Sequence, residues 1–177
     1  GQGLVRDFEI WRNATLPALD KVSFKNFVLN NKSEYQVGLD SIRRLSIKAN
    51  SPNVLVSELS GGNAQKVTIA KWLFSDVKVF LLDEPTVGID IGTKTEILML
   101  VRKLAEVGKA VIIVSSEFEE LLAVSHRIIV MRDGQQIAER LVDDTDEHDL
   151  TLLAAGKGRK SGSATSLNIH SHQGTIS

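Results

Sequence analysis

Two stretches of the chain repeat their apolar residues at helical spacing, and short apolar runs lie between and after them. The first helical stretch extends from Ser60 to about Phe74, and the second extends from Thr93 to Val107, where Gly108 provides a stop. The runs Val79–Leu82 and Ala110–Val114 are typical of strands buried in a parallel sheet. This alternation predicts an α/β fold whose parallel strands are joined by right-handed crossovers.

The residues before Ser57 are expected to be helical and to carry no chemistry of their own. Val5 to Leu19 is typical of a turn with short helical pieces, and Val37 to Lys48 predicts a helix with a partly apolar face. An apolar patch lies between these two segments and consists of Phe24, Phe27, Val28 and Leu29.

The residues after Val114 predict a short helix, a hairpin and a last helix. The expected ranges are Glu117–Val124 for the short helix, Arg127–Met131 and Gln136–Arg140 for the hairpin, and Asp143 through Ala155 for the last helix. The segment from Gly156 to Ser177 is rich in Gly, Ser and Lys and is expected to be disordered. Its His170 and His172 have no third ligand type nearby, so they are not expected to bind a metal.

Composition suits one globular domain or a large part of one, since 42% of the 177 residues are hydrophobic. The formal net charge of -1 gives no basic field, so general nucleic-acid binding is not expected. The absence of cysteine excludes disulfides and thiolate metal sites. No apolar run approaches the roughly 20 residues that span a bilayer, and no signal-peptide pattern is visible. Lys66 and Lys71, on the first helical stretch, are expected to be solvated charges.

A glycine-rich turn opens the first helical stretch, and an acidic pair ends the first strand. Ser60, Gly61 and Gly62 can expose backbone N–H groups at the positive end of the helix dipole, so this turn predicts an anion site. Asp83 and Glu84 follow the apolar run at the edge where α/β sheets place ligands. This pair predicts a site for a metal ion and a water molecule.

The order and separation of these features resemble those of ATP-binding cassette (ABC) ATPases. Leu59-Ser60-Gly61-Gly62-Asn63 is similar to the signature motif, Val79 to Glu84 is similar to the Walker B strand with its catalytic glutamate, and Val87-Gly88-Ile89-Asp90 is similar to the D-loop. Three further motifs resemble the second cassette of bacterial monosaccharide importers of the ribose, galactose and arabinose group. These motifs are Asn63-Ala64-Gln65-Lys66, Thr86 to Gly92, and Ser115-Ser116-Glu117.

The resemblance implies ATP and Mg²⁺ as cofactors and assigns a role to several residues. Asp83 would support Mg²⁺ through a coordinated water, and Glu84 would polarise the attacking water. Ser116 occupies the switch position, where most cassettes place a histidine, and its side chain is too short to replace an imidazole donor. Because one lost donor typically costs about 10²–10³ in rate, poor hydrolysis is expected at the site built on Asp83 and Glu84.

The same resemblance implies that the signature residues serve an opposing cassette. Ser60, Gly61 and Gly62 would contact the γ-phosphate of an ATP that the opposing cassette holds, so the protein would work only as a pair. Asp90 would reach across the pair and couple the two sites. The expected nucleotide-binding set is Leu59, Ser60, Gly61, Gly62, Asn63 and Asp90.

One expected motif is missing, because the chain contains no Gly-x-x-x-x-Gly-Lys-Ser/Thr loop to cradle the β-phosphate. The resemblance therefore implies the C-terminal part of a cassette, a fragment or truncation that is inactive by itself. The expected fold is a partial P-loop NTPase (RecA-like) ABC ATPase fold, with a helical subdomain, a parallel sheet and a C-terminal hairpin. The expected divisions are a helical subdomain at 1–75, the C-terminal half of the catalytic subdomain at 76–142, and a helix with a disordered tail at 143–177.

The resemblance implies an ATP-binding and ATP-hydrolysing subunit that powers monosaccharide import at the cytoplasmic face of the bacterial inner membrane. Its partners would be a second cassette, transmembrane permease subunits and, indirectly, a periplasmic sugar-binding protein. Two alternatives stay open. One is a degenerate cassette with a structural or regulatory role, which Ser116 and the missing loop favour. The other is a soluble ABC ATPase of DNA repair or translation, which would be expected to show coiled-coil heptads or basic faces.

Overall fold

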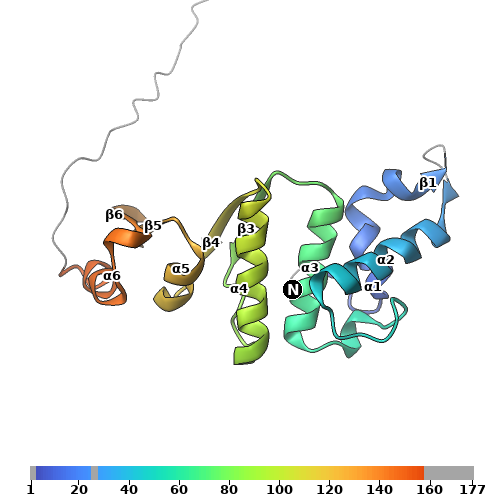
Figure 1. The fold of residues 1–177 in the computed structure, drawn as a ribbon, viewed down its shortest axis with the longest axis horizontal. Coiled ribbons are helices and arrows are strands. Elements are labelled where there is room, and N and C mark those ends of the chain that lie inside the picture. The colour runs from blue at the N-terminus through green and yellow to red at the C-terminus, as the bar shows by residue number, and fades with distance from the viewer. Residues whose placement is uncertain (1–2, 25–27, 158–177) are drawn as a thin grey trace, which may run out of the picture. The chain divides into compact units, whose positions relative to one another are not determined.

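The computed structural model describes residues 3–24 and 28–157, so Phe27 and the predicted tail from residue 158 onward, with its two histidines, lie outside the described residues. Contacts divide the chain into two compact units, residues 1–125 and 126–177. The first unit contains α1 (Ile10–Thr15), the 3-10 helix η1 (Leu16–Val22), β1 (Ser23–Phe24), β2 (Val28–Leu29), α2 (Asn31–Leu45), the 3-10 helix η2 (Val56–Glu58), α3 (Gly61–Phe74), β3 (Val79–Asp83), α4 (Ile91–Glu106), β4 (Ala110–Val114) and α5 (Phe118–Val124) (Figure 1). The second unit contains β5 (Arg127–Arg132), β6 (Gln135–Leu141), the 3-10 helix η3 (Val142–Asp144) and α6 (Glu147–Ala154).

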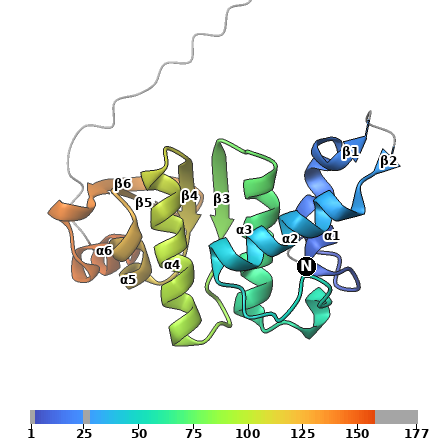
Figure 2. The same cartoon turned by 45° about the vertical axis from the view of Figure 1, so that its right-hand side comes forward.

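Helices α1, α2 and α3 pack around the first hydrophobic core (Figure 2). Its buried members are Ile10, Leu45, Ile47, Val56, Val67 and Ala70. The start of α2 is fixed by Asn30, whose side chain accepts hydrogen bonds from the backbone N–H groups of Lys32 (3.1 Å) and Ser33 (3.2 Å). This N-cap satisfies donors that a helix start otherwise leaves free, and it explains why α2 begins six residues before the predicted Val37.

The expectation that this whole region is helical is wrong at one place. Two short antiparallel strands, β1 and β2, pair Ser23 with Leu29 and Phe24 with Val28. The apolar patch that sequence reasoning noted therefore forms a small hairpin, and Phe24, Val28 and Leu29 are exposed on it. Two-residue strands leave too short an alternation to be recognised in a sequence pattern.

Helix α3 is buried on most of its circumference. Val67 and Ala70 belong to the first core, whereas Ile69 belongs to a second core beside the parallel strands. The prediction that Lys66 and Lys71 face solvent is wrong, because both side chains are buried. Each lysine is nevertheless partnered, as a buried ammonium group must be. Lys66 reaches Glu96, and the Nζ of Lys71 donates to the carbonyl of Gly3 at 2.5 Å.

Strands β3 and β4 confirm the predicted parallel arrangement. Their register pairs Val79 with Ala110 and Asp83 with Val114, and α4 makes the crossover between them (Figure 2). One face of this pair packs on α3 and α4 in the second core. The buried members of that core are Ile69, Phe80, Leu82, Val101 and Leu104.

The opposite face of the two strands is apolar, and no element among the described residues of the first unit covers it. Side chains alternate between the faces of a strand, so every second residue of β3 and β4 projects to this side. Its large apolar members expose 50–70% of their surface and are Val79, Leu81, Ile112 and Val114. Parallel sheets are normally covered on both faces, so this surface is the kind that further structure covers.

The second unit contains the predicted hairpin and last helix. β5 and β6 pair antiparallel, and the turn between them places Asp133 at φ 50° and Gly134 at φ 74°. Two successive positive φ values are the signature of the hairpin turn that Asp-Gly favours. Helix α6 packs against β5, with Leu150 and Leu153 buried.

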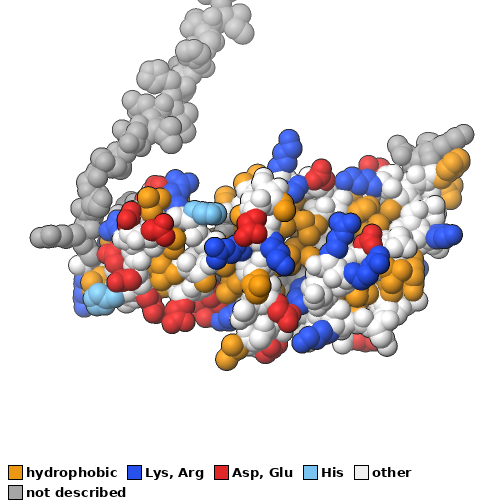
Figure 3. Space-filling view, viewed as in Figure 1, with side chains coloured by type: hydrophobic (Ala, Val, Ile, Leu, Met, Phe, Trp, Pro, Cys, Tyr) orange, Lys and Arg blue, Asp and Glu red, His pale blue; other side chains and the backbone are white. Residues whose placement is uncertain are grey.

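Surface charge follows the near-neutral composition. On the face drawn in Figure 3, basic and acidic side chains are interspersed over the described residues, with hydrophobic side chains between them. No helix among residues 3–24 and 28–157 is both long enough and apolar enough to cross a membrane.

Candidate functional site

The signature turn lies at the N-terminus of α3, and its backbone donors are left open by the local geometry. Ser60 is the N-cap residue, but its side chain makes no capping hydrogen bond. Its Oγ instead accepts a hydrogen bond from Nδ2 of Asn63 at 2.8 Å, while Oδ1 of Asn63 accepts from the backbone N–H of Lys48 at 2.7 Å. The first N–H groups of this 14-residue helix are therefore uncapped by Ser60, as an anion-binding helix start requires.

A close backbone approach explains the second glycine of the turn. A Cβ added to Gly62 would meet Cγ2 of Thr93 at 2.1 Å and Cγ2 of Ile89 at 3.1 Å. Glycine is required here because any side chain would overlap the first turn of α4. At Gly61 the nearest such atom is the carbonyl oxygen of Gly88, at 3.9 Å. The signature turn and the D-loop of one chain are thus packed directly on each other.

Asp90 ends the D-loop and caps α4. Its Oδ1 accepts a hydrogen bond from the backbone N–H of Thr93 at 3.0 Å. This bond holds the pKa of the exposed Asp90 carboxyl below its usual value, and further hydrogen bonding from Thr93 adds to the effect. The carboxylate is therefore ionised at neutral pH and is placed beside the signature turn by the Gly62–Thr93 contact.

Glu84 and Ser116 are brought together at the carboxyl end of the parallel pair. The backbone N–H of Glu84 donates to the carbonyl of Val114 at 2.8 Å, which extends the ladder by one residue. The Oε1 of Glu84 accepts a hydrogen bond from the backbone N–H of Ser116 at 3.0 Å. The contact at the switch position is therefore made by the backbone of Ser116.

Glu84 has two features typical of a functional residue. Its φ of 44° lies in the left-handed region, which costs a residue with a side chain on the order of 1–3 kcal/mol unless its surroundings hold it there. Its Oε2 is buried and has no hydrogen-bond partner among the described residues. A buried carboxylate oxygen without a partner is unusual and marks Glu84 as a candidate functional residue.

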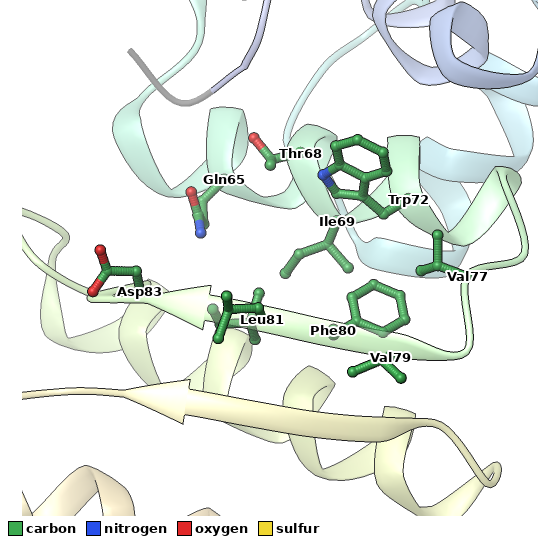
Figure 4. Close-up of a pocket in the computed structure, with 10 residues that line it drawn as sticks. Gln65, Thr68, Ile69, Trp72, Val77, Val79, Phe80, Leu81 and Asp83 are labelled. Carbon is green, nitrogen blue, oxygen red and sulfur yellow. The ribbon is translucent and has the colours of Figure 1, made fainter. Parts of the chain in front are cut away.

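Asp83 is the last residue of β3 and lies on the exposed face of the strand, together with Val79 and Leu81. It forms one end of a pocket of about 420 Å³ between α3 and β3, where it lies near Gln65 and Leu81 (Figure 4). The rest of the lining is mostly apolar and includes Ile69, Trp72, Val77, Val79 and Phe80. Within the described residues, no group of three or more His, Cys, Asp or Glu side chains could hold a metal ion. The metal role of Asp83 stays a prediction.

Sequence reasoning missed a cluster of Glu117, Glu120 and Lys94, which contacts the loops that contain Glu84 and Ser116. Glu120 is only 4% exposed, and its Oε2 accepts a hydrogen bond from Oγ1 of the buried Thr86 at 2.5 Å. Its Oε1 lies 2.6 Å from Nζ of Lys94, which also binds Glu117 at 2.6 Å. The glutamates at the start of α5 belong to no motif, so the pairing of Glu120 with Thr86 and Lys94 could not be predicted from the sequence pattern.

The pKa values in this cluster follow from its geometry. Burial acts to raise the pKa of Glu120, but the hydrogen bonds from Lys94 and Thr86 outweigh it and hold the pKa below its usual value. The hydrogen bonds to Glu117 and then Glu120 raise the pKa of Lys94. Glu120 is therefore a buried carboxylate that is ionised at neutral pH and is paired with the partly exposed Lys94.

An uncapped glycine turn on the D-loop, together with a parallel strand that ends in Asp-Glu, defines an ABC-type ATPase cassette. The sequence profile described as "ABC transporter" matches residues 3–87, and the chain belongs to this family. The chain is 44% identical to a ribose import ATP-binding protein, RbsA, of Bacillus cereus over 155 residues, which cover 88% of this chain and 31% of that protein. It is 42% identical to the xylose import ATP-binding protein XylG of Thermoanaerobacter pseudethanolicus over 154 residues, which cover 87% of this chain and 30% of that protein.

Solved structures confirm the fold class. The cassette MJ0796, in a dimeric post-hydrolysis state bound to ADP and Pi, superposes with a TM-score of 0.67 at 26% identity and covers 80% of this chain and 60% of that chain. An inward-facing metal-chelate type ABC transporter superposes with a TM-score of 0.70 at 17% identity and covers 85% of this chain and 59% of that chain. The predicted ABC ATPase fold is therefore correct, and the chain spans about a third of the length of the curated relatives that it matches.

Proposed function

We propose that this chain is part of an ATP-hydrolysing subunit that powers monosaccharide import. The observation that carries the proposal is the uncapped start of α3, built against the D-loop so that backbone N–H groups of the signature turn can bind a phosphate. The relatives that are named ribose and xylose import ATP-binding proteins support the substrate class. The longer protein would act at the cytoplasmic face of the bacterial inner membrane, with permease subunits and, indirectly, a periplasmic sugar-binding protein as partners.

In this proposal the two halves of the site serve different nucleotides. The signature turn, Leu59 to Asn63, would bind the γ-phosphate of an ATP held by the opposing cassette, and Asp90 would couple the two sites. Asp83 would hold Mg²⁺ through a water, and Glu84 would polarise the attacking water. Mg²⁺ would neutralise charge that develops on the transferred phosphoryl group. Since Asp83 offers a single carboxylate, the phosphates and water would supply the other ligands.

The functional division of the chain remains the one proposed from the sequence. Residues 1–75 would form the helical subdomain, residues 76–142 would belong to the catalytic subdomain, and residues 143–177 would form the terminal helix and tail. The helical subdomain would face the permease, because it contains the signature helix and an exposed apolar hairpin at Phe24, Val28 and Leu29.

The experiment that tests this function compares two substitutions in a longer protein that contains this chain and a phosphate loop. Ser60→Arg blocks the signature turn and should lower ATP turnover at the opposing site by about 10²-fold or more. Glu84→Gln should lower total turnover much less, because Ser116 already weakens this chain's own site. Ser57→Arg, at an exposed position of η2, is the matched control for the added charge. Full activity in the Ser60→Arg protein would overturn the proposal.

A second candidate, a degenerate cassette that only supports its partner, is favoured by the contact at Ser116. The structure shows the Ser116 backbone on Glu84, and a serine side chain cannot reach as far as an imidazole. Ser116→His in the longer protein distinguishes the two candidates. Increased turnover would show that Asp83 and Glu84 are competent for hydrolysis, whereas unchanged turnover together with normal ATP binding would favour the structural role.

A further inference from the structure

Glu120 receives hydrogen bonds or an ion pair from three separate segments. Thr86 Oγ1 donates to it from the loop that follows β3, and Lys94 pairs with it from the first turn of α4. The third donor is Ser115 Oγ, at 3.4 Å, from the loop that follows β4. The Glu120 carboxylate, on α5, therefore ties both loops at the carboxyl end of the parallel sheet to α4.

The hydrogen bonds of the Ser115 side chain fix the conformation of the loop after β4. Ser115 Oγ donates its proton to Glu120 and accepts the backbone N–H of Glu117 at 3.0 Å. The Ser115 hydroxyl thus both donates and accepts a hydrogen bond, and both of its partners follow Ser116 in the chain. The peptide N–H of Ser116 is then directed at Oε1 of Glu84.

The loop after β3 is fixed from the same carboxylate. Thr86 lies two residues after Glu84, and both Pro85 and Thr86 are buried. A residue with a side chain keeps a left-handed backbone only where its neighbours hold it in place. The Thr86–Glu120 hydrogen bond is one such restraint on the loop that contains Glu84 at φ 44°.

We propose that Glu120 is a positioning residue, which holds the Ser116 N–H on the Glu84 carboxylate by bracing both loops at once. The ionised Glu120 carboxylate accepts hydrogen bonds from the Thr86 and Ser115 hydroxyls and forms an ion pair with Lys94. The inference rests on the proposed function only for the role of Glu84 in hydrolysis.

Hydrogen exchange of the Ser116 amide in the 177-residue chain tests the geometry directly. Glu120→Gln keeps the size of the side chain but removes its charge, and Glu119→Gln changes the exposed neighbour as a matched control. The expected result is exchange about tenfold or more faster at Ser116 in Glu120→Gln, with the β3 and α4 amides unchanged and with no change in Glu119→Gln. Unchanged exchange at Ser116, or equal acceleration throughout residues 3–125, would overturn the proposal.

A second pair of variants guards against misfolding of Glu120→Gln. Thr86→Val removes the hydroxyl that donates to Glu120, and Thr86→Ser restores it. Faster exchange at Ser116 in Thr86→Val and recovery in Thr86→Ser are expected, whereas identical behaviour of the two would contradict the bracing role. Because this readout needs no nucleotide, it fails or succeeds independently of the Ser60→Arg turnover assay that tests the proposed function.

Discussion

At the scale of single residues, the signature turn is defined by what its glycines exclude. Gly61 and Gly62 are neighbours at the start of the same helix, yet only Gly62 faces another element closely. Sequence reasoning assigned both glycines to phosphate contact. It could not separate them, because the Thr93 methyl group that meets Gly62 is 31 residues away along the chain.

Substitution of the two glycines by alanine should therefore give unequal results. In Gly62→Ala the new methyl group overlaps Thr93, so we expect a loss of unfolding free energy of about 1–3 kcal/mol, typical of overpacking. In Gly61→Ala the methyl group has room, and the change should be near zero or slightly stabilising, because alanine favours helix more than glycine does. Urea unfolding of both variants measures the difference, and equal losses would contradict the packing explanation.

At the scale of elements, α3 and α4 are joined by a buried lysine. Lys66 is 2% exposed, and its Nζ lies 2.9 Å from the carbonyl of Ser46 and 2.5 Å from Oε2 of Glu96. The start of α2 was predicted six residues too late, but the parallel pairing of β3 and β4 was predictable, because apolar runs report local burial. The lysine bridge was not, since a lysine between apolar residues predicts a solvent-facing position unless its partner is known.

Removal of the Glu96 carboxylate, which pairs with the buried Lys66, should lower the unfolding free energy more than removal of a carboxylate from an exposed ion pair. Glu96→Ala leaves a buried ammonium group with only the Ser46 carbonyl, so we expect a loss of about 1–3 kcal/mol. The control is Glu106→Ala, whose partner Arg102 is exposed, and its loss should be below about 0.5 kcal/mol. Chemical unfolding of the two variants provides the measurement, and equal losses would show that the Lys66 bridge has no special weight.

The cap of α4 predicts a pH dependence of stability. The pKa of Asp90 is lowered in the folded chain, chiefly by the hydrogen bond from the Thr93 N–H, so its contribution is fully present above the unfolded value of about 3.9. The contribution is lost as the pH falls through the lower folded pKa. Asp90→Asn keeps an N-cap that does not titrate, so its unfolding free energy should fall less steeply between about pH 4 and pH 2. Parallel slopes for the two proteins would contradict this assignment.

At the scale of the whole molecule, one face of β3 and β4 is apolar and has no covering element in the described part of residues 1–125. The fold class and the signature, Walker B and D-loop motifs could be assigned from the sequence, because each depends on contiguous residues. The buried cluster at Glu120 could not, since it joins residues from three separate segments. The uncovered face could not either, because apolar runs predict strands buried on both sides and do not reveal which neighbours are present.

This face should bind hydrophobic probes in the isolated chain. A fluorescent dye such as ANS should bind to the folded chain, and Leu81→Gln should reduce the signal, because Leu81 lies in the middle of the exposed face. Met99→Gln, at an exposed apolar position of α4, is the matched control and should change the signal little. Equal reduction by both substitutions would mean that the dye binds elsewhere.

The contact between Gly62 and Thr93 also constrains how this protein can change over evolutionary time. A side chain at position 62 first needs position 93 to lose its methyl group, for instance through Thr93→Ser, and it then still requires small shifts of the Cβ of residue 93 (3.0 Å) and of Cγ2 of Ile89 (3.1 Å). The reverse order passes through an overpacked intermediate, so the accessible mutational paths run in one direction. The two positions are therefore expected to diversify jointly, with the change in α4 preceding the change in the signature turn.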